Sequence, residues 1–571
     1  MSRYMLGLAL VTLIVDTAIF CDFGVAAEAP LSGVTSAELS GWKKDLRQAG
    51  ASRVEVKEFE ELLRRQTPSD LKAWQEWLRH AGASKYLQGT RVEAREQARE
   101  AVPSALFSDA TPVRSCDSLR ELEIPNTTIE SATVDATDHS CRVTANVTHP
   151  PASDRVKVFI GLPLKTWNGR FRGTGGGGFL GGNPESLKSP ISKGYAAGAT
   201  DTGHEGDSPN FALNKSGQLN WQEIRNFAYL GIHDMTTVGK AVAEAFYGKP
   251  PKYSYFVGGS TGGRQALMEA QRFPDDYDGI LSACPAINLH RLVPSDFWAQ
   301  NVMLQSQHFV QKTMLNAATA AAVGACDGTD GVLDGVIDDP NQCTYDPKAL
   351  VGSKVGEGAF SEADAQVVRR IWEGPRSQDG KFLWYGLARG ADLSTVANTE
   401  GAPLKGKPFR YPLEWFQYFL VNDPSWDWTT LLPGEFELLF NQSIEQYRAV
   451  IGTDDPDLSP FRDHGGKLIV YHGLADEVIP AQGSIDYYER VQEKMGGPER
   501  TAEFARLFLV PGVDHGFLGA GPSPTRMMDA IVEWVEGGKA PDRILAESSD
   551  KSGNPVRTRS LFPYPQVEKR D

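Results

Sequence analysis

Length, composition and charge bound the kind of protein that this chain can be. It has 571 residues, of which 41% are apolar and 23% charged, so there is room for a globular catalytic domain and one or two accessory parts. The net charge of -15 argues against a nucleic-acid-binding protein, because phosphate contacts need clustered Lys and Arg. An acidic balance suits a protein that acts on small neutral or mildly acidic molecules.

The first 27 residues have the pattern of a secretory signal peptide. Arg3 precedes an apolar run from Met5 to Phe20, and small residues at 25–27 place the cleavage site after Ala27. No other segment approaches the ~20 apolar residues of a membrane span. We therefore expect a secreted or periplasmic protein with no membrane partner after signal removal. The pattern says nothing about oligomeric state.

Residues 28–105 are predicted to form a helical extension that contains a repeat. The pattern Leu39-x-x-Trp42-x-x-x-Leu46, followed by Ala-Gly-Ala-Ser, returns from Leu71 onward. Leu, Trp and Leu at spacings of three and four lie on one helical face, and each Gly ends a helix. We interpret this part as a helical appendage that packs on the catalytic domain; a docking role is the alternative.

From residue 106 to 287 the pattern changes to strands. Short β-rich runs occur at 131–134 and 141–147, and Cys116 and Cys141 bracket them, which in an exported chain predicts a disulfide. The next strand, 155–163, leads into a glycine-rich loop at 173–179. No Gly-Lys-Ser/Thr helix start follows this loop, so it is not a phosphate-binding loop.

The stretch from Tyr253 to Gln265 combines a buried strand, a turn and a helix. An apolar run ends at Gly258-x-Ser260-x-Gly262, and apolar residues then recur at helical spacing. A nucleophile elbow needs this composition, because the serine is strained and side chains two positions away would collide with neighbouring backbone. Such a motif arises by chance in Gly-rich chains, so Ser260 needs partners elsewhere.

Two later strands deliver such partners. The run 467–471 leads into a loop that ends on Asp476, and the run 507–510 leads into a loop with His515. A parallel α/β sheet places its active site at the carboxyl ends of its strands, and the order serine, acid, histidine is that of the α/β-hydrolase fold. We predict Ser260, Asp476 and His515 as the catalytic triad.

Three alternatives to this triad exist. Asp476 is also a plausible helix N-cap, Asp514 a plausible acid, and His472 a plausible base. Asp514 is the weaker acid candidate, because adjacent side chains on a loop rarely face each other well enough to share a proton.

In a hydrolase the glycine-rich loop serves best as an oxyanion hole. The carbonyl oxygen gains charge during attack, and backbone N–H groups approach it closely only where no side chain intervenes. We expect one donor from this loop, Gly177 or Gly176, and the other from the N–H of Thr261, just after the nucleophile.

The segment 288–466 interrupts this order between the nucleophile strand and the acid strand. It is rich in aromatic residues, for example at 382–385 and 415–419. Its position predicts a lid over the catalytic face. A single aromatic residue is more often core than substrate contact, but the set suggests a pocket for a flat ring.

Within this insertion, Cys326 and Cys343 bracket an aspartate-rich loop. Asp327, Asp330 and Asp334, separated by glycines, have a composition that can surround one hard cation such as Ca²⁺. The spacing is not that of an EF-hand, and a surface turn rich in Asp-Gly is the alternative.

Five stretches together resemble the tannase and feruloyl esterase family, which includes hydrolases of mono(hydroxyethyl) terephthalate. They are Trp167–Phe171 with Gly175–Phe179, Thr200–His204, the Ser260 elbow, the loop from Cys326 to Cys343, and Tyr471–Asp476. The resemblance covers about residues 116–565. It implies an α/β-hydrolase fold with a lid insertion at 288–466 and a second part of the hydrolase domain at 467–571, preceded here by the helical extension.

The resemblance also implies a metal site. It places a structural Ca²⁺ at Asp327, Asp330, Val332, Asp334 and Val336, in a loop that Cys326 and Cys343 close. No other cofactor is expected.

One departure from the family's pattern concerns cysteines. The family usually joins the serine and histidine loops by a disulfide, whereas this chain has Gly259 and Gly516 at those places. We expect a Gly259→Cys and Gly516→Cys pair to form that bridge, unless backbone angles require glycine there. Cys284, in a buried strand, is expected to be unpaired.

The residues and the resemblance together predict a secreted serine carboxylesterase that hydrolyses esters of aromatic acids through an acyl-enzyme. Hydroxycinnamic, gallic and terephthalic esters all remain open, and so do the corresponding feruloyl or chlorogenate-type esterase, tannase and terephthalate monoester hydrolase activities. A non-catalytic protein that binds aromatic ligands on the same fold is the alternative of another class.

Overall fold

The computed structural model describes residues 100–108, 111–549 and 555–568. The predicted signal peptide and helical repeats lie outside the described residues. None of the described helices is both long and apolar enough to cross a membrane.

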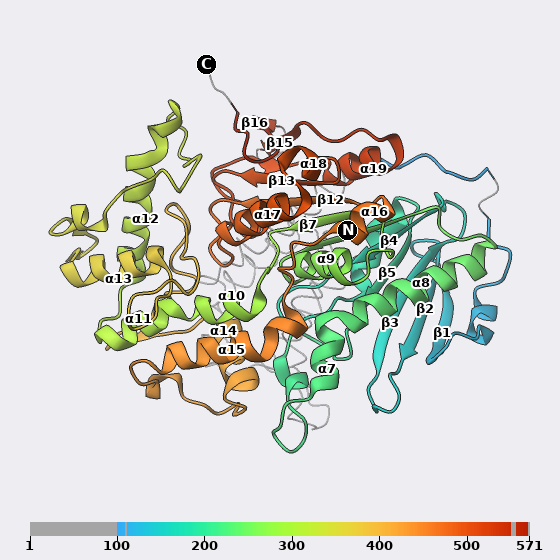
Figure 1. Cartoon of the computed structure of the whole chain (residues 1–571), viewed down its shortest axis with the longest axis horizontal. Coiled ribbons are helices and arrows are strands. Elements are labelled where there is room, and N and C mark those ends of the chain that lie inside the picture. The colour runs from blue at the N-terminus through green and yellow to red at the C-terminus, as the bar shows by residue number, and fades with distance from the viewer. Residues whose placement is uncertain (1–99, 109–110, 550–554, 569–571) are drawn as a thin grey trace, which may run out of the picture. The chain divides into compact units, whose positions relative to one another are not determined.

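A mixed sheet of nine strands forms the centre of the described structure, in the order β1-β2-β3-β5-β4-β6-β7-β12-β13 (Figure 1). From β5 to β13 every neighbouring pair is parallel, whereas β1, β2 and β3 pair antiparallel. The strands are β1 Thr127–Asp135, β2 Ser140–Val147, β3 Val156–Pro163, β4 Arg170–Thr174, β5 Ala196–Thr200, β6 Tyr253–Gly259, β7 Gly279–Ala283, β12 Lys467–Gly473 and β13 Ala505–Val510. This confirms the predicted α/β-hydrolase fold.

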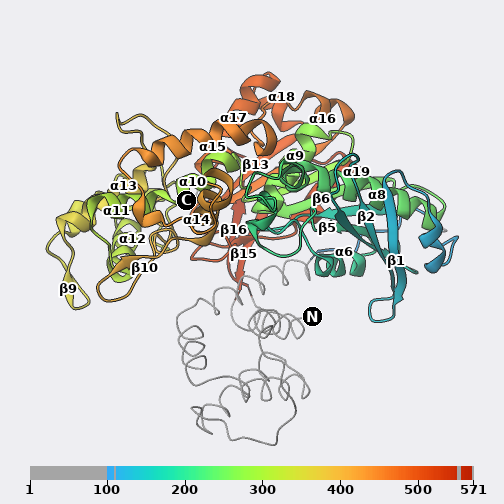
Figure 2. The ribbon, with the colours of Figure 1, turned by 90° about the horizontal axis from the view of Figure 1, so that it is seen from below.

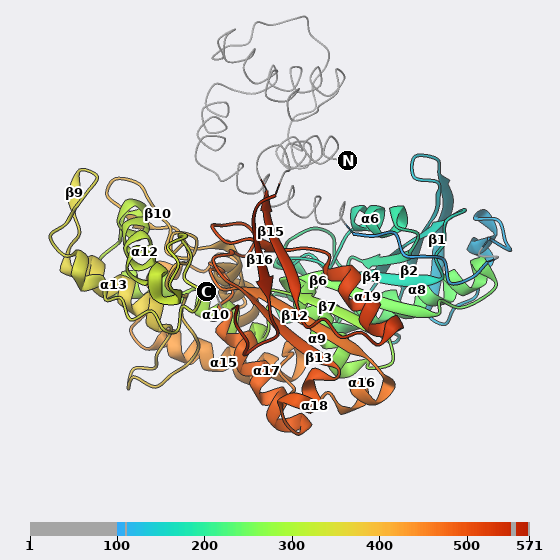
Figure 3. The same ribbon diagram turned by 90° about the horizontal axis from the view of Figure 1, so that it is seen from above.

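Helices cover both faces of the sheet, which is why the central strands β4, β5 and β7 are buried along their whole length, the arginines of β4 included. In the two side views α8, α9, α16 and α17 lie on one face and α6 and α19 on the other (Figures 2 and 3). The helices of this part are α6 Lys188–Ser192, α7 Trp221–Arg225, α8 Gly231–Tyr247, α9 Thr261–Arg272, α16 Ser459–His464, α17 Gln482–Met495, α18 Pro498–Ala502 and α19 Met527–Gly537.

The insertion between β7 and β12 adds no strand to the nine-stranded sheet, and its helices α10 to α15 lie on the side away from β1 (Figures 1 and 3). Trp415, Phe416 and Phe419 are fully buried there, so these aromatic residues form the insertion's own core. Its elements are α10 Leu289–Asp296, α11 Trp298–Ser306, α12 Lys312–Cys326, α13 Glu362–Glu373, α14 Arg410–Glu414, α15 Glu435–Ile451, and the hairpins β8 Lys354–Val355 with β9 Gly358–Ala359 and β10 Thr399–Glu400 with β11 Lys405–Gly406.

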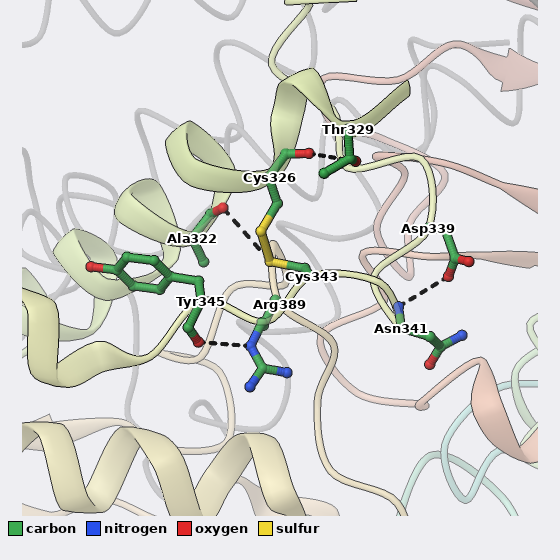
Figure 4. Close-up of a disulfide and its surroundings, with 8 residues drawn as sticks. All are labelled: Ala322, Cys326, Thr329, Asp339, Asn341, Cys343, Tyr345 and Arg389. Atoms are coloured by element: carbon green, nitrogen blue, oxygen red, sulfur yellow. Dashed lines mark hydrogen bonds between the residues drawn. A yellow bond between two sulfur atoms is a disulfide. The ribbon is translucent and has the colours of Figure 1, made fainter. Parts of the chain in front are cut away.

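The C-terminal part forms a small antiparallel sheet of β14 Ser523–Pro524, β15 Ile544–Ser549 and β16 Pro555–Leu561. Both predicted disulfides are present. Cys116 is bonded to Cys141 on β2, and Cys326 to Cys343, with Cα atoms 5.6 and 5.5 Å apart. Figure 4 shows the second bond, which ties the end of α12 to the far end of the aspartate-rich loop. Cys284 is free and buried, as expected.

Candidate active site

Ser260 lies at the turn between β6 and α9 in a strained conformation. Its φ and ψ are 59° and -121°. A Cβ at Gly258 would come within 2.4 Å of the Gly262 backbone, and one at Gly262 within 2.9 Å of the Gly176 carbonyl oxygen. Only glycine fits at these two positions, because the elbow is tight at Gly258 and packs against the glycine-rich loop at Gly262. The turn is therefore the nucleophile elbow that the motif predicts.

The structure brings the three predicted triad residues into one hydrogen-bonded chain. The Ser260 Oγ lies 3.1 Å from His515 Nε2, and His515 Nδ1 lies 2.8 Å from Asp476 Oδ2. Asp476 follows the carboxyl end of β12, and His515 follows that of β13. The two strands are parallel neighbours, so their loops meet at the edge where β6 delivers the serine.

The alternative base and acid have partners of their own, and His472 Nε2 also lies 3.2 Å from Asp476 Oδ2. His472 is fully buried, with one ring nitrogen 2.9 Å from Ser484 Oγ and the other 3.0 Å from the Ile479 carbonyl oxygen. Asp514 Oδ1 accepts the N–H groups of Gly516 and Leu518, which shapes the histidine loop. Neither side chain is the histidine or the acid of the observed triad.

Asp476 combines two functions that the sequence presented as alternatives. Its Oδ1 accepts the backbone N–H groups of Val478 and Ile479 at 2.9 and 2.7 Å, which caps the local turn. That capping leaves Oδ2 facing His515. The side chain is 1% exposed, so its orientation is fixed by the loop itself.

The electrostatics of the pair favour charge on both partners. Burial opposes the charged form of Asp476, but His515 and His472 outweigh it and hold the pKa of Asp476 well below its ordinary value. Burial likewise lowers the pKa of His515, but Asp476 outweighs it and the net pKa of His515 is raised. An imidazole beside a permanent carboxylate is a strong base that is stabilised when it takes the serine proton.

Two residues that we did not predict hold the main chain of His515. The His515 N–H donates to Glu477 Oε2 at 3.0 Å, and the Cys284 thiol lies 3.8 Å from the His515 carbonyl oxygen. Cys284 follows β7 with a positive φ of 30°. No sequence pattern links either residue to His515, although Glu477 adjoins the predicted acid.

In the oxyanion loop, residues 175–180, the backbone N–H groups that are free to bind an oxyanion are not the ones that we expected. The Gly176 N–H donates to Gln265 Oε1 at 2.9 Å, and the Gly177 N–H donates to the Leu180 carbonyl oxygen at 3.1 Å. Neither expected loop donor is available, because the loop closes on itself and on α9. Within the described part of the chain, the N–H groups of Gly178 and Thr261 have no acceptor.

The backbone geometry at positions 259 and 516 does not require glycine. Neither has a positive φ. The nearest atom to a Cβ at Gly516 would be Asp514 Oδ1 at 3.5 Å, and a Cβ at Gly259 would lie 3.5 Å from the Ala283 Cβ and 4.0 Å from the Cys284 Sγ. Both places have room for a side chain, and the existing thiol of Cys284 lies beside the first.

The aspartate-rich loop holds its carboxylates on its own backbone. Asp327 accepts the N–H groups of Asp334, Gly335 and Val336 at 3.0 to 3.2 Å, and the Arg557 guanidinium lies 3.3 Å from Asp334 Oδ2.

The carboxylate and carbonyl oxygens of the aspartate-rich loop are the types of ligand atom that Ca²⁺ prefers. The carboxylates of this loop do not point at one common position. Among the described residues, the group of three Asp, Glu, His or Cys side chains with ligating atoms close together is Cys284, Asp476 and His515, which lies at the triad. In the described structure Asp327, Asp330 and Asp334 do not bring three carboxylates together.

A second buried acid, Asp296 on α10, lies near the triad and was not predicted. It lines a small cavity with Trp298, Tyr385 and Pro480, beside the loop that carries Asp476. Burial, with Asp476 second, raises the pKa of Asp296 well above its ordinary value. A neutral acid here adds no second negative charge beside His515.

An elbow serine hydrogen-bonded to a histidine and a buried aspartate on this sheet defines the class of α/β-hydrolases. A sequence profile described as "Tannase and feruloyl esterase" matches residues 141–570, and the chain belongs to this family.

Named relatives agree with this assignment. The chain is 40% identical over 458 residues to a "Probable feruloyl esterase" of Arthroderma benhamiae, covering 78% of this chain and 83% of that one. It is 30% identical to "Feruloyl esterase B" of Aspergillus niger, covering 82% and 95%. Among solved structures, feruloyl esterase B from Aspergillus oryzae superposes with a TM-score of 0.69 at 26% identity, covering 79% and 95%.

Proposed function

We propose that this protein is a serine carboxylesterase that hydrolyses esters of aromatic acids. The observation that carries the proposal is the continuous hydrogen-bonded chain from Ser260 Oγ through His515 to Asp476, at 3.1 and 2.8 Å. A protein that only bound aromatic ligands would have no use for a strained serine aligned with a base.

In the proposed mechanism Ser260 attacks the ester carbonyl carbon, and His515 takes its proton and returns it to the leaving alcohol. The N–H groups of Gly178 and Thr261 stabilise the oxyanion, each by about 3 kcal/mol of barrier. Asp476 keeps the imidazole in the required tautomer. Water, activated by His515, then attacks the acyl-enzyme and releases the aromatic acid.

Feruloyl-type esters are our first choice of substrate, ahead of gallate and terephthalate esters. The two relatives named above, at 40% and 30% identity, carry the name feruloyl esterase. The insertion supplies aromatic side chains next to the oxyanion loop, among them Tyr411 and Phe419, whose rings lie 5.6 and 5.8 Å from that of Phe179. Phe179 and Phe419 are buried, so these rings pack behind the loop as core, and the choice of substrate rests on the relatives.

The test is a hydrolysis panel of methyl ferulate, chlorogenate, methyl gallate and mono(hydroxyethyl) terephthalate. We expect the hydroxycinnamic esters to have the highest kcat/KM. An activated aryl ester should also give a burst of product, which separates an acyl-enzyme from a binding protein. Binding of ferulate without turnover of any ester, activated or not, would exclude the proposed function.

We further propose that the protein is exported, that the aspartate-rich loop binds a structural Ca²⁺, and that the serine and histidine loops are held without the disulfide typical of the family. Export is supported by the pattern of residues 1–27 and by the two disulfides. Calcium is supported by the donor types at Asp327, Asp330 and Asp334, with Val332 and Val336 offering backbone carbonyls. The third rests on glycine at 259 and 516.

A further inference from the structure

The oxyanion loop is held from two sides. On its inner side α9 fixes it: Gln265 accepts the Gly176 N–H, and the Thr261 hydroxyl donates to the Gly178 carbonyl oxygen at 2.6 Å. On its outer side the Phe179 N–H donates to Asp207 Oδ1 at 2.8 Å. The peptide group between Gly178 and Phe179 is therefore clamped between Thr261 and Asp207.

The second oxygen of Asp207 belongs to the insertion. Tyr411, at the start of α14, donates its hydroxyl to Asp207 Oδ2 at 2.7 Å. Arg410 lies 3.3 Å from the same oxygen and also donates to the Asp207 carbonyl oxygen. One carboxylate thus connects the oxyanion loop with the first turn of α14, although these segments are more than two hundred residues apart in the sequence.

The ring of Tyr411 also lies directly on the oxyanion loop. Gly178 has a φ of 59°, and a Cβ there would come within 2.5 Å of the Tyr411 ring. This close approach requires glycine at 178. A shift of Tyr411 would consequently be felt at the glycine whose N–H is the loop's free donor.

The two contacts to Asp207 Oδ2 differ in strength. Burial, and next Asp207, raise the pKa of Tyr411, so its hydroxyl stays protonated and donates a short charge-assisted bond. The side chain of Arg410 is 46% exposed and that of Asp207 32%, so water and salt screen their ion pair. The hydroxyl of Tyr411 is the contact that should matter.

We propose that Asp207 is a positioning residue that couples the seating of the insertion to the alignment of the Gly178 N–H. With Tyr411 bound to Oδ2, Oδ1 holds the Phe179 N–H and the loop presents its donor to the oxyanion. Without that contact the carboxylate is free to turn and the loop loses its outer anchor. This inference rests on the proposed esterase function of the same site.

The experiment compares Tyr411→Phe, Asp207→Asn and the double variant with wild type. Tyr411→Phe removes only the hydroxyl, and Asp207→Asn keeps the shape but sets an amide N–H against Arg410 or Phe179. Tyr447→Phe is the matched control. Its hydroxyl donates at 2.6 Å to the Phe419 carbonyl oxygen, so it belongs to the same aromatic core but holds no part of the oxyanion loop.

For each variant kcat, KM, melting temperature and two affinities are measured: that for an arylboronic acid, which mimics the tetrahedral intermediate, and that for the planar product acid. We expect Tyr411→Phe and Asp207→Asn to lower kcat about tenfold and to weaken boronate binding in proportion. KM and product affinity should stay within twofold. The kcat of the double variant should be no lower than that of the less active single variant, because both changes break the same connection between Asp207 and Tyr411. Tyr447→Phe should lower the melting temperature and leave kcat unchanged.

An unchanged kcat in both single variants, or losses that multiply in the double variant, would overturn the coupling. The coupling would also be overturned if Tyr447→Phe and Tyr411→Phe lowered the melting temperature equally and lowered kcat equally. The loss of kcat would then come from a general loss of stability in the aromatic core. Any ester that wild type turns over through Ser260 serves as substrate. A failed aromatic panel would therefore revise the proposed substrate class and leave this test intact.

Discussion

Asp476 shows how one residue connects loop structure to chemistry. Its two oxygens have separate tasks, since Oδ1 caps the turn at Val478 and Ile479 and Oδ2 holds His515. The carboxylate is buried and raises the pKa of His515, so kcat/KM should fall as pH falls through that pKa.

The change Asp476→Asn tests this assignment. Removing the charge lowers the pKa of His515, so the acid limb of kcat/KM should move to lower pH while kcat drops by about 10⁴. Asp514→Asn is the control, because its amide oxygen still accepts the N–H groups of Gly516 and Leu518. If Asp514→Asn shifts the limb and Asp476→Asn does not, the acid has been misassigned.

Gly259 gives a second test at this scale. Because a Cβ there would lie 4.0 Å from the Cys284 Sγ, the single change Gly259→Cys should form a bond with Cys284 under oxidising conditions. The closed loop is short, so the gain in stability should be about 3 kcal/mol less any strain. Thiol titration in denaturant, with peptide mapping, should find no free thiol at 259 or 284. Two free thiols would mean that residue 259 and Cys284 lie further apart than the structure has them; the bridge to Gly516→Cys should then be sought with Cys284→Ala.

At the scale of elements, the sequence was a good guide wherever a local pattern carries the structure. The strands at β6, β7, β12 and β13 and the turn at Ser260 follow from apolar runs that stop at glycine or at a polar residue. The partners of the oxyanion loop do not, because Asp207 and Tyr411 are distant in sequence from Phe179 and from each other. The free N–H at Gly178 also depends on the turn that Gly177 closes with Leu180, which a run of identical glycines does not reveal.

At the scale of elements, the prediction concerns calcium binding by the aspartate-rich loop. If it binds Ca²⁺, calcium at a hundred times its Kd should stabilise the protein by about 2.7 kcal/mol, and a chelator should lower the melting temperature. Asp330→Ala should abolish both the shift and the bound metal, with kcat unaffected. Asp423→Ala, which removes another aspartate that caps a turn in the insertion, should leave the calcium response intact. A chelator without effect on wild type would contradict the calcium site and leave the guanidinium groups of Arg557 and Arg559, beside Asp334 and Asp338, as the cations that this loop contacts.

At the scale of the whole molecule, segments before and after the insertion build one sheet, and helix α9, packed on that sheet, carries a buried acid. Glu269 on α9 is fully buried, and its carboxylate oxygens have no hydrogen-bond donor among the described residues. Burial, with the charge of Asp276 second, raises its pKa well above 4.5. A raised folded pKa contributes stability that is fully present below the unfolded pKa and is lost as pH rises toward the folded one.

Denaturant unfolding at several pH values tests this consequence. Wild type should lose about 1.4 kcal/mol per pH unit relative to Glu269→Gln above pH ~4.5, because Glu269 must stay neutral in the folded state and ionises in the unfolded state. The change Glu373→Gln, at an exposed position of α13, is the control and should show no such slope. A constant difference between Glu269→Gln and wild type from pH 5 to 8 would contradict the raised pKa.

The family and the catalytic core followed from the sequence, since five motifs and the strand pattern can be recognised in this one chain. The long-range contacts that position the catalytic groups are visible only in the folded structure. Glu477 and Cys284 contact the main chain of His515, and Asp207 connects the oxyanion loop with α14. Such contacts are single hydrogen bonds between loops, with no period or spacing to mark them. Residues 1–99 of the chain lie outside the described part, so the predicted helical repeats stay a prediction.

The central claim is that Ser260 is the nucleophile, and the turnover of Ser260→Ala on an activated aryl ester tests it most directly. The melting temperature is measured on the same sample, so that a folding defect is recognised. We predict a loss of more than about a thousandfold in kcat at an unchanged melting temperature, because no neighbouring side chain replaces the hydroxyl. A folded Ser260→Ala variant that keeps turnover within tenfold of wild type would contradict the account.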